Sequence, residues 1–86
     1  MPQPWRVAHS PFVYIRAEPS TEAEMLAVLW PGDMLRAAAR RGRWLRTAEP
    51  VGGKLFGWVL EDGRPLGLGK LLLPAGGSLN TANVYA

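Results

Sequence analysis

The chain has 86 residues and no cysteine, so it forms one small domain without disulfide bonds, a thiolate metal site or a cysteine nucleophile. Hydrophobic residues make up 48%, which is enough for a core, whereas 10 glycines and 8 prolines argue against a helical bundle and favour a turn-rich β fold. Ten Lys and Arg residues and seven Asp and Glu residues give a net charge of +3.

Both ends of the chain differ from its charged middle. Residues 1–11 are rich in proline and predict an irregular N-terminal arm, and residues 74–86 are small and uncharged and predict a C-terminal arm. The N-terminus lacks the apolar segment of a signal peptide, and a plastid location would require a transit peptide that has been removed. No segment has the roughly 20 apolar residues of a membrane span, so contact with a membrane complex would be peripheral.

The first half of the charged middle, between the two arms, shows short apolar segments separated by turns. Residues 12–16 (FVYIR) are rich in aromatic and β-branched residues and predict a strand, and residues 17–24 predict a polar loop. Residues 25–30 (MLAVLW) form a short apolar segment that ends at the turn dipeptide Pro31-Gly32.

Residues 34–40 (MLRAAAR) fit two predictions, because their alanine content favours a helix and their alternation favours a strand. We favour the strand, because Arg41-Gly42 can form a tight hairpin turn into a second strand at residues 43–47.

The second half of the charged middle continues this pattern of short apolar segments and turns. Residues 54–60 (KLFGWVL) predict the most apolar strand, and Gly57 inside it indicates a bulge or a close approach of another segment. A turn at residues 61–65 and a glycine-punctuated segment at residues 66–73 follow, with one turn of 3-10 helix and a last short strand. Five or six short strands at this spacing predict a small barrel or sandwich.

Several of these segments occur together, in order, in one family. An apolar-Arg strand precedes a Pro-Ser-Thr loop (residues 14–21), a Gly turn follows (31–33), and Trp-bearing strands come next (43–45 and 57–59), before Leu71-Leu72. This order resembles the bacterial-type Src-homology-3-like (SH3b) family. The resemblance implies an all-β fold, a five-stranded SH3-like barrel at residues 12–73 between the two arms, and binding rather than catalysis. The segment EDGRPLGLG is similar to small barrel modules of dinoflagellate algae.

Two departures from the family pattern limit what the resemblance implies. The chain has Ala17-Glu18-Pro19 where the family often has a glycine before the proline, and residues 61–69 are longer and richer in glycine than the usual ending. The aromatic strand and acidic loop of classical proline-binding SH3 domains are also missing. Binding of PxxP peptides is therefore not expected.

The candidate catalytic residues favour ordinary structural roles. His9 has no second His or Cys to complete a typical zinc site, so we expect a surface histidine. Glu61-Asp62 precedes a glycine and is typical of a turn, since adjacent strand residues point to opposite faces. Gly67-Leu68-Gly69 is too short for a dinucleotide fingerprint. We expect no catalytic residue, no metal and no cofactor.

Five arginines gather around the predicted hairpin of residues 34–47, and on two adjoining strands they would form one positive patch: Arg36, Arg40, Arg41, Arg43 and Arg46. The interpretation with the greatest weight is that these arginines form an ordinary solvent-exposed face. An acidic partner protein comes next, because Arg pairs well with carboxylates. Nucleic acid comes last, because Trp44 is the only nearby aromatic residue for base stacking.

The four tryptophans have different predicted roles. Trp44 and Trp58 match core or groove positions of the resembled family, where packing is the first expectation and ligand contact the second. Trp30 precedes Pro31 and would cap the barrel. Trp5 either folds back onto the barrel or inserts into a partner, since large aromatics are favoured anchors. With the five arginines, Trp5, Trp44 and Trp58 form the predicted partner-binding set.

The sequence thus predicts a non-catalytic protein-interaction module, a small accessory subunit of a larger assembly such as a photosynthetic complex. Its partners would be other protein subunits, with an acidic surface favoured. The alternative is a free ligand-binding module for a peptide, a glycan or RNA.

Overall fold

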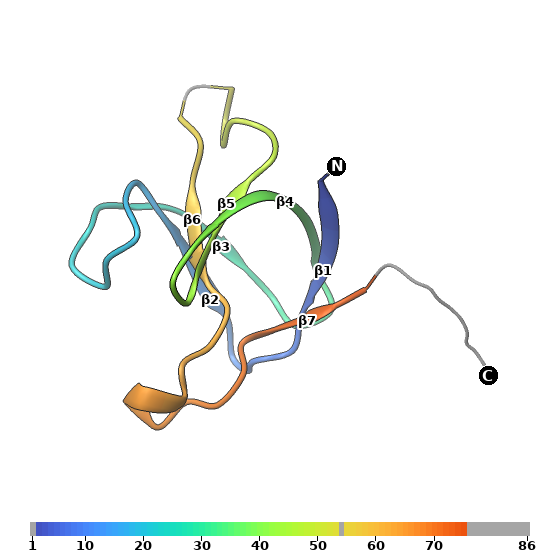
Figure 1. The fold of residues 1–86 in the computed structure, drawn as a ribbon, viewed down its shortest axis with the longest axis vertical. Coiled ribbons are helices and arrows are strands. Elements are labelled where there is room, and N and C mark those ends of the chain that lie inside the picture. The colour runs from blue at the N-terminus through green and yellow to red at the C-terminus, as the bar shows by residue number, and fades with distance from the viewer. Residues whose placement is uncertain (1, 54, 76–86) are drawn as a thin grey trace.

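The computed structural model describes residues 2–53 and 55–75 and confirms the all-β class (Figure 1). One antiparallel sheet has the order β3-β2-β6-β5-β4-β1-β7, so β3 and β7 are its edges and hydrogen bonding does not close it. A 3-10 turn, η1, covers Arg64–Leu66. The strands are β1 (Gln3–Val7), β2 (Val13–Arg16), β3 (Met25–Leu29), β4 (Met34–Arg41), β5 (Trp44–Thr47), β6 (Trp58–Leu60) and β7 (Leu72–Pro74).

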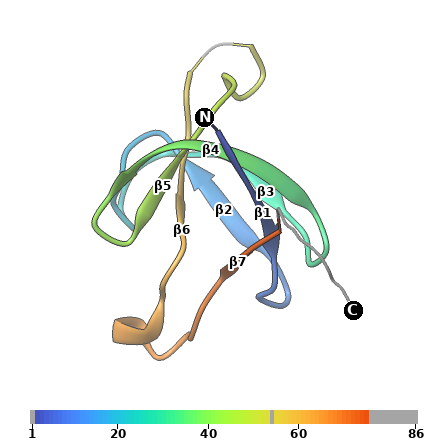
Figure 2. The same ribbon diagram turned by 45° about the vertical axis from the view of Figure 1, so that its right-hand side comes forward.

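The prediction of an irregular N-terminal arm is wrong for residues 3–7, which form β1. This strand lies between β4 and β7, as Figure 2 shows, and Trp5 pairs with Leu35 on one side and Pro74 on the other. Trp5 and Val7 are buried and alternate with less buried residues, the two-residue period of a strand with one face in the core. Burial of these apolar side chains outweighs the poor strand propensity of proline. The predicted C-terminal arm falls mostly on residues 76–86, outside the described residues.

The predicted hairpin of β4 and β5 is confirmed, so the strand interpretation of residues 34–40 holds. Arg41 pairs with Trp44 across the turn, and Gly42 has the positive φ of 60° that such a turn needs. A bulge at Ala38 shifts the register between Ala37 and Ala39. This extra residue changes which face the later side chains of β4 occupy.

The predicted strand at residues 54–60 is shorter in the structure, where β6 begins at Trp58. The close approach expected at Gly57 is confirmed. A methyl group on Gly57 would overlap Cγ2 of Ile15 and lie 3.0 Å from Cγ2 of Val51. The Gly57 N–H donates to Oγ1 of Thr47 at 3.0 Å, so this glycine lets β6 pack closely on its neighbours.

The core gathers side chains from both ends of the chain. Val7, Val59 and Leu72 are fully buried, and they come from β1, β6 and β7. The remaining buried apolar residues are Trp5, Val13, Ile15, Ala37, Leu45 and Leu71. No helix in the described part of the chain is long and apolar enough to cross a membrane.

Candidate functional site

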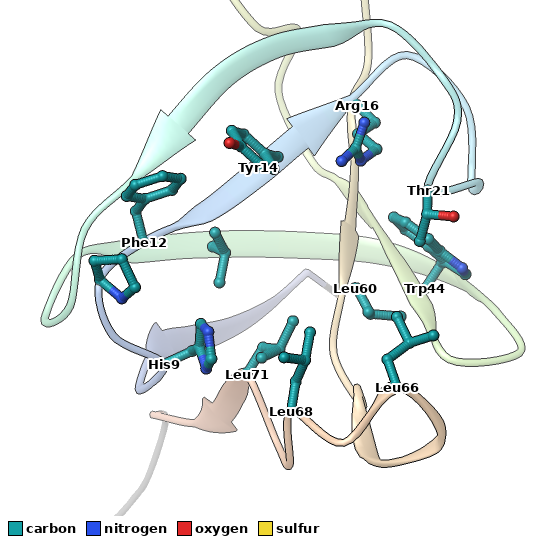
Figure 3. A pocket seen from close by; sticks show the side chains of 12 residues that line it. His9, Phe12, Tyr14, Arg16, Thr21, Trp44, Leu60, Leu66, Leu68 and Leu71 are labelled. Atoms are coloured by element: carbon teal, nitrogen blue, oxygen red, sulfur yellow. The ribbon is translucent and has the colours of Figure 1, made fainter.

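Two adjoining pockets form one groove along the outer face of β2, β6 and β5. The first has a volume of about 380 Å³ and the second about 280 Å³, and both are lined by Thr21, Trp44, Leu60 and Leu66. In Figure 3, Tyr14 and Arg16 project from β2 on one side of the first pocket, and Leu66 and Leu68 lie on the other. We call this continuous surface the groove.

The strand register explains why several side chains of the groove lie on one face of the sheet. Residues directly opposite each other on neighbouring strands share a face. Trp44 pairs with both Arg41 and Leu60, so these three side chains lie on the same face of the sheet. Arg16 pairs with Trp58, two residues before Leu60, which places Arg16 on that face as well.

A cluster of aromatic rings borders the first pocket, where Phe12 and Tyr14 line the pocket and Trp30 packs against Phe12. The Phe12 ring lies edge-on to Tyr14, with centroids 5.2 Å apart, and to Trp30 at 5.4 Å. The Arg16 guanidinium lies over Tyr14, 5.0 Å from its centroid, and donates to the Ala23 carbonyl at 2.9 Å. These contacts hold the β2 wall in one arrangement.

The opposite wall depends on an ion pair between Asp62 and Arg64. Arg64 donates from Nη2 to Oδ2 of Asp62 at 2.6 Å, and from Nε to Oδ1 at 2.9 Å. The backbone N–H of Arg64 also donates to Oδ1 at 3.1 Å. Hydrogen bonds from the Arg64 side chain and backbone hold the pKa of Asp62 well below its usual range. The pair fixes the start of η1, and η1 presents Leu66 to the groove, 57% exposed.

A second carboxylate supports the groove from inside the fold. Glu61 is buried and receives hydrogen bonds from Arg40 and Lys70. Burial raises the pKa of Glu61, but the hydrogen bonds from Lys70 and Arg40 outweigh burial, so its pKa lies below the ordinary value. Glu61 is therefore an ionised structural group rather than a proton donor at neutral pH.

The bulge at Ala38 divides the predicted arginine patch. Before the bulge, Ala37 pairs with buried Thr47, so the neighbouring Arg36 points outward, where it pairs with Glu49 at 3.3 Å. After the bulge, Arg40 pairs with Leu45, whose side chain is in the core. Arg36 and Arg40 therefore lie on opposite faces of the sheet.

The other three arginines of the patch remain on the outer face or at the turn. Arg41 and Arg43 line the second pocket. Arg46 lies over Phe56, 4.8 Å from its ring centroid, and its half-buried side chain is away from both pockets of the groove. The expected single patch is therefore wrong, and only Arg41 and Arg43 of the five belong to the groove.

The predicted tryptophan set is also divided. Trp44 lines both pockets, as ligand contact requires. Trp5 is only 6% exposed, so the fold-back alternative is correct and its role as a partner anchor is wrong. Trp58 is half-buried, lies below the Arg41 guanidinium at 5.7 Å, and lines neither pocket.

Sequence reasoning missed several residues of the groove, namely Phe12, Tyr14, Leu60, Leu66 and Leu68. The two aromatic residues alternate with buried Val13, and large aromatics on the solvent side of a strand are a signal that could have been used. His9 also lines the first pocket and is half-buried.

The groove offers apolar contact and positive charge. Among its lining residues only Asp62 is a carboxylate, and Arg64 already binds that group. Within residues 2–53 and 55–75, no three His, Asp or Glu side chains are grouped so that they could hold a metal ion. The arrangement can bury apolar side chains of a ligand and pair with an anion.

Comparison of the chain with protein-family models, with curated proteins and with solved structures found no match. The assignment to the SH3b family therefore stays a prediction from the sequence pattern.

Proposed function

We propose that this protein is a non-catalytic protein-interaction module that binds an extended segment of a partner protein in the groove. The groove itself carries this proposal. Its two pockets fall in or near the usual size range of ligand sites, roughly 300–1,000 Å³, and combine apolar walls with a few polar groups.

The exposure of the groove walls supports binding over simple packing. Leu66 is 57% exposed and Leu68 is 46% exposed, beside half-buried Tyr14 and Trp44. A partner side chain inserted between these walls would remove apolar surface from water, at about 25 cal/mol per Å². Neighbouring exposed apolar residues of this kind mark interaction sites.

The strand order supports the finer fold assignment that accompanies this proposal. The five strands β2 to β6 are contiguous in the sheet, and we assign them to an SH3-like barrel to which β1 and β7 are added at the β4 side. The partner would be another subunit of an assembly. Because β1 is built into the sheet, docking would use the groove rather than an N-terminal arm.

A peptide-display experiment tests the function. The full chain would be immobilised and offered a random octapeptide library, and the selected peptides would be measured against three proteins: the unchanged chain, Leu66→Ser and Leu55→Ser. Leu55 is a matched control, because it is 53% exposed and lines neither pocket of the groove.

We expect Leu66→Ser to weaken binding of the selected peptides by about tenfold, the equivalent of one buried leucine side chain, and Leu55→Ser to leave binding unchanged. Selection of no peptide at all, or equal loss in both variants, would show that the groove is not the binding site.

A further inference from the structure

Three of the arginines that make no ion pair in the described part of the chain lie together along the groove. Four ion pairs involve Arg36 with Glu49, Arg40 with Glu61, Arg64 with Asp62 and Lys70 with Glu61. By contrast, five arginines have no carboxylate within ion-pair distance in the described part of the chain: Arg6, Arg16, Arg41, Arg43 and Arg46. Three of these five, Arg16, Arg41 and Arg43, line the groove, whereas Arg6 and Arg46 do not.

The three unpaired arginines of the groove make other contacts. Arg16 lies over Tyr14 and donates to a backbone carbonyl. Arg41 lies over the Trp58 ring, and the Arg43 carbonyl accepts a hydrogen bond from the Glu61 N–H at 2.8 Å, which ties the hairpin turn to the segment after β6. Three positive charges thus stand along a groove whose one carboxylate, Asp62, is neutralised by Arg64.

We propose that the groove is selective for an acidic segment of a partner protein. Apolar side chains of that segment occupy the first pocket, and one or more Asp or Glu side chains pair with Arg41 and Arg43 at the second. This inference rests on the proposed function and adds the chemistry of the ligand. A guanidinium binds a carboxylate through two parallel hydrogen bonds, and complementary charge gives an interface specificity and a faster association.

A polypeptide fits this surface better than a nucleic acid does. Phe12, Leu66 and Leu68 line the first pocket together with Pro11 and Val13, and this apolar lining suits side chains rather than a phosphate backbone. Single-stranded nucleic acids need several aromatic platforms beside a cationic track. The groove holds three aromatic side chains, Phe12, Tyr14 and Trp44, but only Trp44 lines the second pocket beside Arg41 and Arg43, while Phe12 and Tyr14 pack edge-on against each other in the first.

The display experiment is extended to test selectivity. Peptides selected by the unchanged chain are sequenced, and the affinity of one selected acidic peptide, its Gln-for-Glu counterpart and a decameric oligouridine is measured by fluorescence anisotropy. The protein variants are Arg41→Gln/Arg43→Gln and the control Arg36→Gln. Arg36 is also an exposed arginine of β4, but it is paired with Glu49 and lines neither pocket.

We expect the selected peptides to be enriched in Asp and Glu beside apolar residues. The double variant should bind the acidic peptide at least about tenfold more weakly, and Arg36→Gln should stay within about twofold. Raising the ionic strength to about 0.5 M should weaken binding to the unchanged chain.

Selection of neutral or basic peptides whose affinity ignores Arg41→Gln/Arg43→Gln would overturn the acidic selectivity while leaving groove binding intact. Selection of no peptide would contradict the proposed function as well. Oligouridine binding that needs Arg41 and Arg43, without acidic peptides, would replace a protein partner by a nucleic acid and overturn this inference.

Discussion

Nη1 of Arg40 lies 3.0 Å from Oε1 of Glu61, a carboxylate whose side chain is only 5% exposed. Lys70 binds the other oxygen of the same carboxylate. The three residues come from β4, from the segment after β6 and from the segment before β7. One buried carboxylate therefore ties β4 and the segment before β7 to the segment after β6.

Replacing Glu61 by glutamine should destabilise the protein by about 1–2 kcal/mol at neutral pH, because two cations lose their charged partner. The pKa of Glu61 is lowered in the folded state, so its stabilising contribution is complete above the ordinary carboxyl pKa and is lost as the pH falls through the folded value. The difference in the free energy of unfolding between the unchanged chain and Glu61→Gln should therefore shrink between about pH 5 and pH 3.

Urea unfolding followed by tryptophan fluorescence at several pH values measures this difference. The control is Glu49→Gln, which removes an ion pair whose side chains are 57% and 61% exposed. That variant should change stability by less than about 1 kcal/mol at every pH. A Glu61→Gln difference that is independent of pH would contradict the ionised, paired state of Glu61.

The ion pair of Asp62 and Arg64 should control the groove wall more than the whole fold. Asp62→Ala removes the acceptor at the start of η1, where the N–H groups of Leu66 and Leu68 donate to the Gly63 carbonyl. We expect faster hydrogen exchange at these two amides and weaker binding of groove-selected peptides, with little change in the exchange of β2 amides. Uniformly faster exchange would mean that Asp62 supports the entire fold instead.

Gly57→Ala should be destabilising by about 1–3 kcal/mol, because its methyl group would overlap Ile15 and press on Val51. The clash can be relieved from the other side by Ile15→Ala. In a double-mutant cycle, the two substitutions together should therefore cost less than the sum of their separate costs. Additive costs in thermal unfolding experiments would show that the segment around Gly57 moves away freely.

Trp5→Ala should destabilise the protein by about 3–5 kcal/mol, because the side chain is 6% exposed in the core. In a domain of this size that loss approaches the total stability, so the variant should be largely unfolded by circular dichroism. Trp30→Ala is the matched comparison, because Trp30 is 56% exposed. It should lose less than about 1 kcal/mol. A folded Trp5→Ala chain would restore the idea of a dispensable N-terminal arm.

Local sequence patterns predicted much of the middle of the fold. The aromatic and β-branched residues at 12–16, the turn at Gly42 and the close approach at Gly57 all depend on neighbours in the chain or on one backbone property. Each was confirmed, although β6 is shorter than the apolar run that contains it. Local preference was enough where strands are joined by tight turns.

The candidate site was less predictable, because its residues meet only after folding. The arginines were expected to form one patch, but a single extra residue at Ala38 placed Arg36 and Arg40 on opposite faces. Leu66 and Leu68 follow a turn and showed no periodic pattern, yet they form the wall opposite Tyr14. No local signal relates these positions, which are about fifty residues apart in the sequence.

Residue type and short-range alternation are enough to predict the all-β class, the hairpin and the lack of disulfide bonds. Long-range packing, by contrast, places Trp5 in the core and brings Arg41, Arg43 and Trp44 into one groove with η1. Local sequence does not reveal these placements, because burial and strand register depend on long-range pairing. β1 becomes a strand by lying between β4 and β7, and a bulge selects which arginines face the groove.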